Sequence, residues 1–201
     1  FADAAAKTRR GFTVTGSDAN VYPPMSTFLE EEGITLFEGY KASNIPPDAD
    51  VIVIGNAMSR GNEEVEAVLQ RRLRYLSLPE TMKEYFLRGK RNYVITGTHG
   101  KTTTTSMLAW LMEDSGLNPS FMIGGIATNL GRGGRFTDSD FSVLEGDEYD
   151  TAFFDKRSKF LHYLPELVVI NNIEFDHADI YNSLEEIKLS FRRLTQIITC
   201  N

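Results

Sequence analysis

A glycine-rich turn between an expected strand and an expected helix constrains this chain most. Residues 97–103 read Gly-Thr-His-Gly-Lys-Thr-Thr and follow the apolar run 93–96. In residues 102–113, apolar side chains recur at helical spacing. In such a turn, backbone N–H groups and the helix N-terminus face an anion, while lysine adds positive charge and a hydroxyl ligates Mg²⁺. The segment therefore predicts a binding site for a nucleoside triphosphate.

The turn is shorter than the general phosphate loop. That pattern has a glycine six residues before the lysine, whereas Ile95 stands there in this chain and Gly97 is the first glycine. A plain strand-to-helix turn with a surface lysine is therefore the alternative interpretation.

Composition narrows the class of protein. The 201 residues suffice for one large or two small domains, and a net charge of −7 argues against a general nucleic-acid binder. The single cysteine, Cys200, excludes a disulfide within the chain. No apolar stretch approaches the ~20 residues of a membrane span. We expect a cytoplasmic protein without nucleic-acid or membrane partners; the sequence does not indicate its oligomeric state.

The order of the expected elements is that of an α/β protein with two domains. We expect a Rossmann-like domain in residues 1–90 and a nucleotide-binding domain of the phosphate-loop type in residues 91–201. A first helix followed by a strand that ends at Asp18 is typical of the second half of a mononucleotide-binding unit. We therefore expect both domains to be incomplete here, the first lacking its opening strand and the second its C-terminal part.

Periodicity and turn residues place the elements. Strands are expected at residues 12–15, 34–37, 51–54, 75–78, 93–96, 121–123, 141–145, 167–171 and 196–199. Helices are expected at residues 23–32, 62–73, 79–87, 102–113 and 183–194. Asn62 and Ser183 are expected N-caps. The glycines at 124–125 and 131–134 predict loops.

An acidic cluster follows the expected strand at 141–145. It contains Glu145, Asp147, Glu148 and Asp150. In α/β sheets, ligands bind beyond the carboxyl ends of strands, so the cluster is expected at the same edge as the phosphate loop. Neighbouring carboxylates repel one another unless water or a metal ion relieves the repulsion. A magnesium site and a solvated acidic turn are both consistent with this pattern.

The strand expected at 167–171 leads to His177, which adds a third candidate at this edge. Imidazole is a good metal ligand, although Mg²⁺ prefers oxygen. Because Lys101, Glu145 and His177 all follow strands, we favour a metal-assisted phosphate site over a structural histidine. Five other residues stay open between a local structural role and ligand binding: His99, Asp155, Lys156, Arg157 and His162.

The motifs at residues 97–102, 145–148 and 172–177 together resemble the Mur ligases, ATP-dependent enzymes that form amide bonds in bacterial cell-wall synthesis. Residues 15–20, 55–62 and 147–160 resemble the peptidoglycan-recycling branch. That branch joins UDP-N-acetylmuramate to the murein tripeptide L-alanyl-γ-D-glutamyl-meso-diaminopimelate. The branch that adds L-alanine typically has Ser at the position of Tyr149 and lacks the run at 155–157.

The resemblance implies ATP and Mg²⁺ as cofactors and a role for each matching residue. It assigns ATP binding to Gly97, Thr98, His99, Gly100, Lys101, Thr102 and Thr103. It assigns catalysis to Lys101, Glu145 and His177, and magnesium ligation to Thr102, Glu145 and His177. It assigns contacts with UDP-N-acetylmuramate to Asp18, Asn56, Ser59 and Asn129.

The implied reaction passes through an acyl phosphate, which the tripeptide amine then attacks. Four alternatives remain open. They are a UDP-N-acetylmuramate–L-alanine ligase, a ligase similar to folylpolyglutamate synthetase, a nucleotide-dependent kinase or switch, and a noncatalytic nucleotide-binding fragment.

Overall fold

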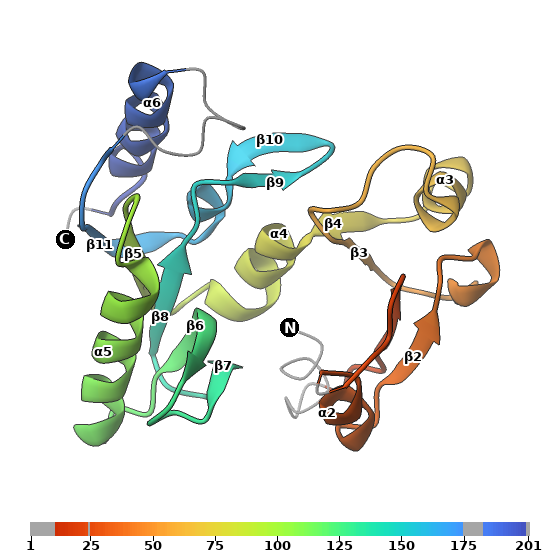
Figure 1. Cartoon of the computed structure of the whole chain (residues 1–201), viewed down its shortest axis with the longest axis horizontal. Helices are drawn as coiled ribbons and strands as arrows, with labels where there is room; N and C mark the ends of the chain where they lie inside the picture. The colour runs from red at the N-terminus through yellow and green to blue at the C-terminus, as the bar shows by residue number, and fades with distance from the viewer. Residues whose placement is uncertain (1–10, 24, 175–182, 200–201) are drawn as a thin grey trace. The chain divides into compact units, whose positions relative to one another are not determined.

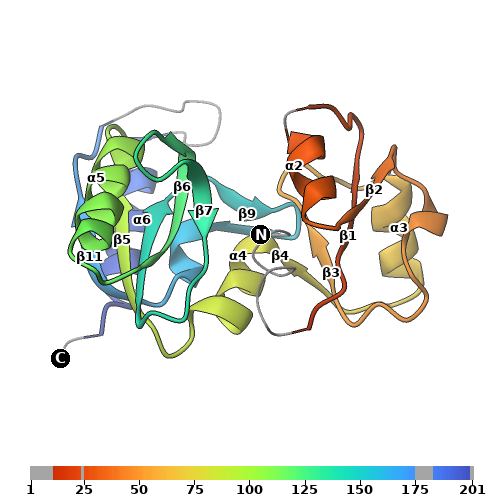
Figure 2. The same cartoon turned by 90° about the horizontal axis from the view of Figure 1, so that it is seen from below.

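The computed structural model describes residues 11–23, 25–174 and 183–199. The chain divides into two compact units, Phe1–Leu78 and Pro79–Asn201. The first runs from red to yellow in Figure 1 and the second from yellow-green to blue, and Figure 2 shows both from below. Among the described residues, no helix has both the length and the apolar character needed to cross a bilayer.

The first unit contains two parallel strand pairs, each joined through a helix. Its strands are β1 (Thr15–Asp18), β2 (Thr35–Glu38), β3 (Ile52–Ile54) and β4 (Tyr75–Ser77). Its helices are α2 (Met25–Glu31), the 3₁₀ helix η1 (Ala42–Asn44) and α3 (Glu63–Gln70). β1 pairs with β2 and β3 with β4, both in parallel. This strand–helix–strand order confirms the α/β expectation.

Local signals predicted α3 well and β1 less well. The Asn62 side chain caps α3 by accepting hydrogen bonds from the backbone N–H groups of Glu64 and Val65, at 3.0 and 3.1 Å. β1 starts at Thr15, whereas the sequence predicted a strand at 12–15. The ladder begins at Thr15 because its partner strand β2 begins at Thr35, directly opposite.

A five-stranded sheet with the order β11-β5-β8-β6-β7 forms the centre of the second unit. The first four strands are parallel to one another, and β7 is antiparallel to β6. The sheet strands are β5 (Arg91–Thr96), β6 (Ser120–Ala127), β7 (Arg132–Arg135), β8 (Phe141–Gly146) and β11 (Pro165–Ile170). The remaining elements are α4 (Leu78–Met82), the π-helix η2 (Lys83–Leu87), α5 (Lys101–Asp114), the hairpin strands β9 (Asp150–Ala152) and β10 (Asp155–Ser158), the 3₁₀ helix η3 (Lys159–His162) and α6 (Leu184–Thr195).

Helix α5 packs on the sheet through an apolar core. The core cluster comprises Ile95, Ala109, Met112, Phe121, Ile123 and Val143. These residues come from β5, β6, β8 and α5, so their burial holds α5 against the sheet. On α6, Ser183 is the N-cap and accepts a hydrogen bond from the N–H of Glu186, as the sequence predicted.

Three sequence predictions were wrong. Gly124 and Gly125 lie within β6 rather than in a loop, and three of the glycine-segment residues at 131–134 lie in β7. A Cβ atom on Gly133 would lie 2.9 Å from the carbonyl oxygen of Gly125, so this glycine permits close strand approach. Residues 196–199 form a turn after α6 instead of a strand. In addition, residues 150–158, for which the sequence predicted no strand, form the β9–β10 hairpin.

Candidate active site

The turn between β5 and α5 has the backbone shape of a phosphate site. Gly97 and Gly100 both have positive φ, 127° and 79°, a conformation that glycine adopts without a side-chain penalty. Gly100 is the N-cap of α5 and has no side chain to cap the helix. The first N–H groups of any α-helix have no intrahelical acceptor, so those of α5 face the space beyond the turn. That arrangement fits a bound phosphate.

The segment after β11 holds this turn in place. The N–H of Thr98 donates to the carbonyl of Asn172 at 3.2 Å, and the N–H of His99 donates to the Asn172 side chain at 2.8 Å. Thr98 Oγ1 accepts a hydrogen bond from the N–H of Glu174 at 2.9 Å. The Asn171 amide donates to the His99 carbonyl at 3.2 Å. The sequence placed the two asparagines at a strand end but did not predict that they support the loop.

Gly97 is the position in this turn where a side chain is least tolerable. A Cβ atom there would lie 2.9 Å from the carbonyl oxygen of Asn172 and 3.0 Å from its nitrogen. We expect Gly97→Ala to destabilise the protein by ~1–3 kcal/mol and to weaken Mg-ATP binding strongly. The alanine strains the backbone of the turn and displaces the Asn172 backbone that supports it. Thermal unfolding and calorimetric titration with Mg-ATP measure the two effects.

Gly116 provides a matched control for that substitution. Its φ is 78°, but nothing lies within 4 Å of an added Cβ atom. Gly116→Ala is therefore expected to lose some stability through backbone strain alone while Mg-ATP binding stays unchanged. If Gly97→Ala binds Mg-ATP as tightly as the unaltered protein, the turn is not the phosphate site.

Lys101 folds back over the turn and pairs with a buried carboxylate. Its Nζ atom lies 2.8 Å from the carbonyl oxygen of Gly97 and 3.0 Å from Glu148 Oε2. The side chains of Lys101 and Glu148 are 14% and 3% exposed. An ammonium group thus lies at the mouth of the phosphate turn, where the sequence predicted it. The pairing with Glu148 was not predicted.

Two of the three predicted magnesium ligands are neighbours. Thr102 Oγ1 donates to Glu145 Oε1 at 2.9 Å, and the N–H of Gly124 donates to Glu145 Oε2 at 2.7 Å. The carboxyl end of β8 therefore meets the first turn of α5. Hydroxyl and carboxylate oxygens are suitable ligands for Mg²⁺. The third predicted ligand, His177, lies outside the described residues.

The acidic cluster is neutralised largely by lysines. Glu148 pairs with Lys101, while Asp147 pairs with Lys159 at 2.7 Å and Asp150 with Lys156 at 2.8 Å. The sequence pattern indicated water or a metal ion as the neutralising agent and did not predict these pairs. Glu145 differs from the other three, since it accepts hydrogen bonds from a hydroxyl and from a backbone N–H. Its negative charge therefore suits a bound cation.

Tyr163 is buried beside this cluster. Burial raises the pKa of its phenol, and the negative charges of Asp147 and Glu145 raise that pKa further. The phenol therefore stays neutral throughout the physiological pH range.

The predicted sugar-site residues are divided between the two units. Asp18 ends β1, and its side chain accepts a hydrogen bond from the N–H of Asn20 at 3.1 Å. Asn56 and Ser59 are exposed in the segment after β3. Asn129 is exposed in the turn between β6 and β7 of the second unit. Asp18, Asn56 and Ser59 thus lie at or beyond the carboxyl ends of parallel strands, and all four roles remain predictions.

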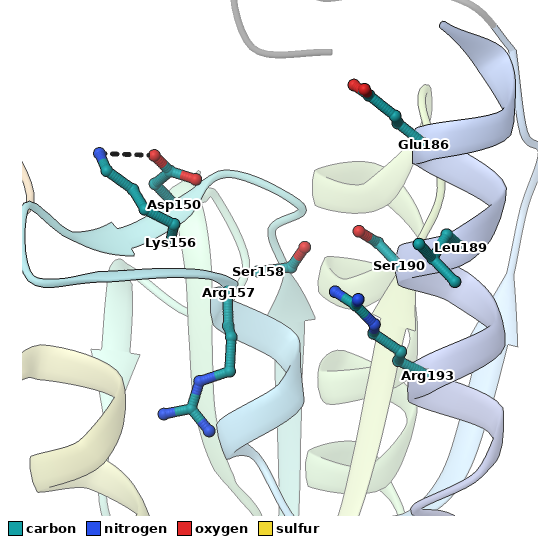
Figure 3. Close-up of a pocket in the computed structure, with 8 residues that line it drawn as sticks. All are labelled: Asp150, Lys156, Arg157, Ser158, Glu186, Leu189, Ser190 and Arg193. Atoms are coloured by element: carbon teal, nitrogen blue, oxygen red, sulfur yellow. Dashed lines mark hydrogen bonds and ion pairs between the residues drawn. The ribbon is translucent and has the colours of Figure 1, made fainter. Parts of the chain in front are cut away.

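A cavity of about 350 Å³ separates the β9–β10 hairpin from α6 (Figure 3). Its lining consists of Asp150, Lys156, Arg157, Ser158, Glu186, Leu189, Ser190 and Arg193. No predicted ATP, metal or sugar ligand is among them. The charges of Lys156 and Arg157 are paired with Asp150 and Asp155 at 2.8 and 2.6 Å. In Figure 3 the Arg157 guanidinium points away from α6.

Comparisons with known proteins define the family. Residues 3–89 match the family model described as Mur ligase family, catalytic domain, and residues 95–200 match the Mur ligase middle domain. The chain therefore belongs to the Mur ligase family, which confirms the resemblance and the fold class expected from the sequence.

Several relatives share most of this chain. It is 52% identical over 188 residues to the UDP-N-acetylmuramate–L-alanyl-γ-D-glutamyl-meso-2,6-diaminoheptandioate ligase of Escherichia coli, covering 94% of this chain and 41% of that protein. It is 37% identical to the UDP-N-acetylmuramate–L-alanine ligase of Syntrophus aciditrophicus, covering 94% of this chain and 37% of that protein. The chain thus spans about two fifths of the length of these curated relatives.

A solved structure agrees with this relationship. The UDP-N-acetylmuramate:L-alanyl-γ-D-glutamyl-meso-diaminopimelate ligase from Neisseria meningitides superposes with a TM-score of 0.93 at 47% sequence identity. The match covers 100% of this chain and 65% of that one.

Proposed function

We propose that this chain supplies the sugar-nucleotide domain, residues 1–90, and the ATP-binding domain, residues 91–201, of a cytoplasmic ligase. The ligase joins UDP-N-acetylmuramate to the tripeptide L-alanyl-γ-D-glutamyl-meso-diaminopimelate, as in peptidoglycan recycling. One observation supports it above others: the phosphate turn, Lys101, Thr102 and Glu145 converge in a chain 52% identical to a ligase named for that reaction.

The proposed chemistry requires two anions to meet. The carboxylate of UDP-N-acetylmuramate attacks the γ-phosphorus of ATP, the bond between that phosphorus and the β–γ bridging oxygen breaks, and an acyl phosphate and ADP result. Lys101 and the N-terminus of α5 lower the repulsion between the carboxylate and the triphosphate. Mg²⁺ held by Thr102 and Glu145 supplies further charge neutralisation. We assign His177 to the same metal set on the basis of the family motif.

The second step forms the amide. The tripeptide amine attacks the acyl carbon, a tetrahedral intermediate forms, and phosphate leaves. The amine loses a proton in this step. None of the described residues is assigned as the base, and Asn129 is proposed to contact the reacting carboxylate.

The L-alanine ligase is the second candidate, and it is favoured only by the 37% identity to an enzyme of that name. Acceptor-dependent ADP release distinguishes the two. In the full-length protein with UDP-N-acetylmuramate and Mg-ATP, we expect the tripeptide to stimulate ADP release much more than L-alanine does. Stimulation by L-alanine and not by the tripeptide would reassign the chain to the biosynthetic branch. ADP release that depends on neither acceptor would contradict ligation.

A further inference from the structure

Three potential metal ligands from separate elements, none of them a predicted magnesium ligand, converge in the second unit. Glu80 lies on α4, Asp155 on β10 and His162 on η3. One ligand atom from each lies within 4.8 Å of the other two. Asp155 and His162 are largely buried, with side chains that are 10% and 3% exposed.

The His162 imidazole provides an independent reason to consider a ligand here. Its Nε2 atom is buried and has no hydrogen-bond partner of acceptable geometry, although Asp155 Oδ2 lies 3.1 Å away. A buried polar atom without a partner destabilises the fold. A buried nitrogen that lies next to a carboxylate oxygen without hydrogen-bonding to it can share a metal ion with that oxygen.

We propose that Glu80, Asp155 and His162 bind a divalent transition metal of the zinc class. Imidazole nitrogen and carboxylate oxygen are both zinc ligands, and three protein ligands with water in the fourth position form an open zinc site. Two ligand atoms held ~2.0–2.1 Å from zinc at a tetrahedral angle are roughly 3.3 Å apart. The 3.1 Å between His162 and Asp155 is close to that spacing. Glu80 completes the set through small side-chain rotations.

Arg157 orients the central ligand. Its Nε donates to Asp155 Oδ1 at 2.9 Å and its Nη2 to Oδ2 at 2.6 Å, which fixes the plane of the carboxylate. Hydrogen-bonded partners of this kind commonly orient metal ligands. Because Arg157 also neutralises Asp155, the fold does not depend on the metal. The ion instead links the β9–β10 hairpin to α4 and η3.

Zinc binding to the full-length, tag-free protein tests this assignment. After removal of metals with a chelator, calorimetry with Zn²⁺ and visible absorption with Co²⁺ measure affinity and coordination. Zinc bound at the predicted magnesium ligands is excluded by working in a Glu145→Gln background. We expect about one equivalent of zinc in that background and at least about tenfold weaker binding after Glu80→Gln or His162→Ala.

Two variants keep the result interpretable. Glu80→Gln keeps the shape of the side chain, so weaker zinc binding in this variant is not explained by unfolding. His162→Ala alone would not make that distinction. His99→Ala removes an exposed histidine and should leave zinc binding unchanged. The assignment is overturned if the Glu145→Gln protein binds no zinc, or if Glu80→Gln and His162→Ala both bind it as tightly as that parent does. Neither readout depends on ligase activity.

Discussion

Lys101→Ala in the full-length ligase is expected to lower kcat by about 10²- to 10³-fold while the affinity for UDP-N-acetylmuramate changes little. The ammonium lies at the phosphate turn, 2.8 Å from the Gly97 carbonyl, and its charge is needed most as negative charge shifts during phosphoryl transfer. Steady-state kinetics measure the first effect, and equilibrium dialysis with the sugar nucleotide measures the second. Equal losses in turnover and sugar affinity would contradict the role assigned to Lys101.

This substitution also affects folding, because Glu148 is 3% exposed and loses its lysine. Removing one partner of a buried ion pair costs up to about 3–5 kcal/mol. The double substitution Lys101→Met with Glu148→Gln removes both charges and is expected to recover most of that stability. It should remain as inactive as Lys101→Ala. Recovery of activity together with stability would mean that Lys101 acts only through the fold.

Glu145→Gln is expected to reduce turnover by about 10²- to 10³-fold and to raise the Mg²⁺ concentration needed for half-maximal activity. The carboxylate accepts from Thr102 Oγ1 and from the Gly124 N–H through different oxygens. An amide has one oxygen, so its NH₂ group must face one of these donors, and it also loses the negative charge that suits Mg²⁺. Titrating MgCl₂ at saturating ATP measures the shift.

Asp147→Asn is the matched control for Glu145→Gln. Asp147 belongs to the same acidic cluster, but its charge is paired with Lys159 at 2.7 Å. We expect Asp147→Asn to keep the Mg²⁺ dependence of the unaltered enzyme. If the two variants shift that dependence equally, the general charge of the cluster matters and Glu145 is not a specific ligand.

Local signals in the sequence predicted most elements of this fold. The side-chain caps Asn62 and Ser183 mark helix starts through contacts two or three residues away, so they can be recognised without the tertiary structure. Gly124 and Gly133 were wrongly predicted to lie in loops, because the contacts that favour glycine there come from neighbouring strands. The Glu145 side chain approaches Gly124 closely, and the backbone of Gly125 approaches Gly133. The segment 196–199 has strand-like residues, but it ends α6 through a hydrogen bond from Ile197 to Leu194.

The sequence predicted those contacts of the candidate site that sheet topology determines. It did not predict the contacts that depend on side-chain conformation. Parallel strand ends share an edge, which is why Thr102 and Glu145 were expected to be close. The support of the turn by Asn172 and the pairing of Lys101 with Glu148 depend on rotamers and on the course of loops. The sequence pattern contains no periodic signal for either contact.

The most direct test of the account is the position of the metal ion in a crystal of the full-length protein grown with Mn²⁺ and a nonhydrolysable ATP analogue. We expect the triphosphate to lie on the turn at residues 97–103, with anomalous manganese density in coordinating contact with Thr102 Oγ1 or with the carboxylate of Glu145. A triphosphate bound elsewhere, or manganese that contacts neither side chain, would contradict the central claim.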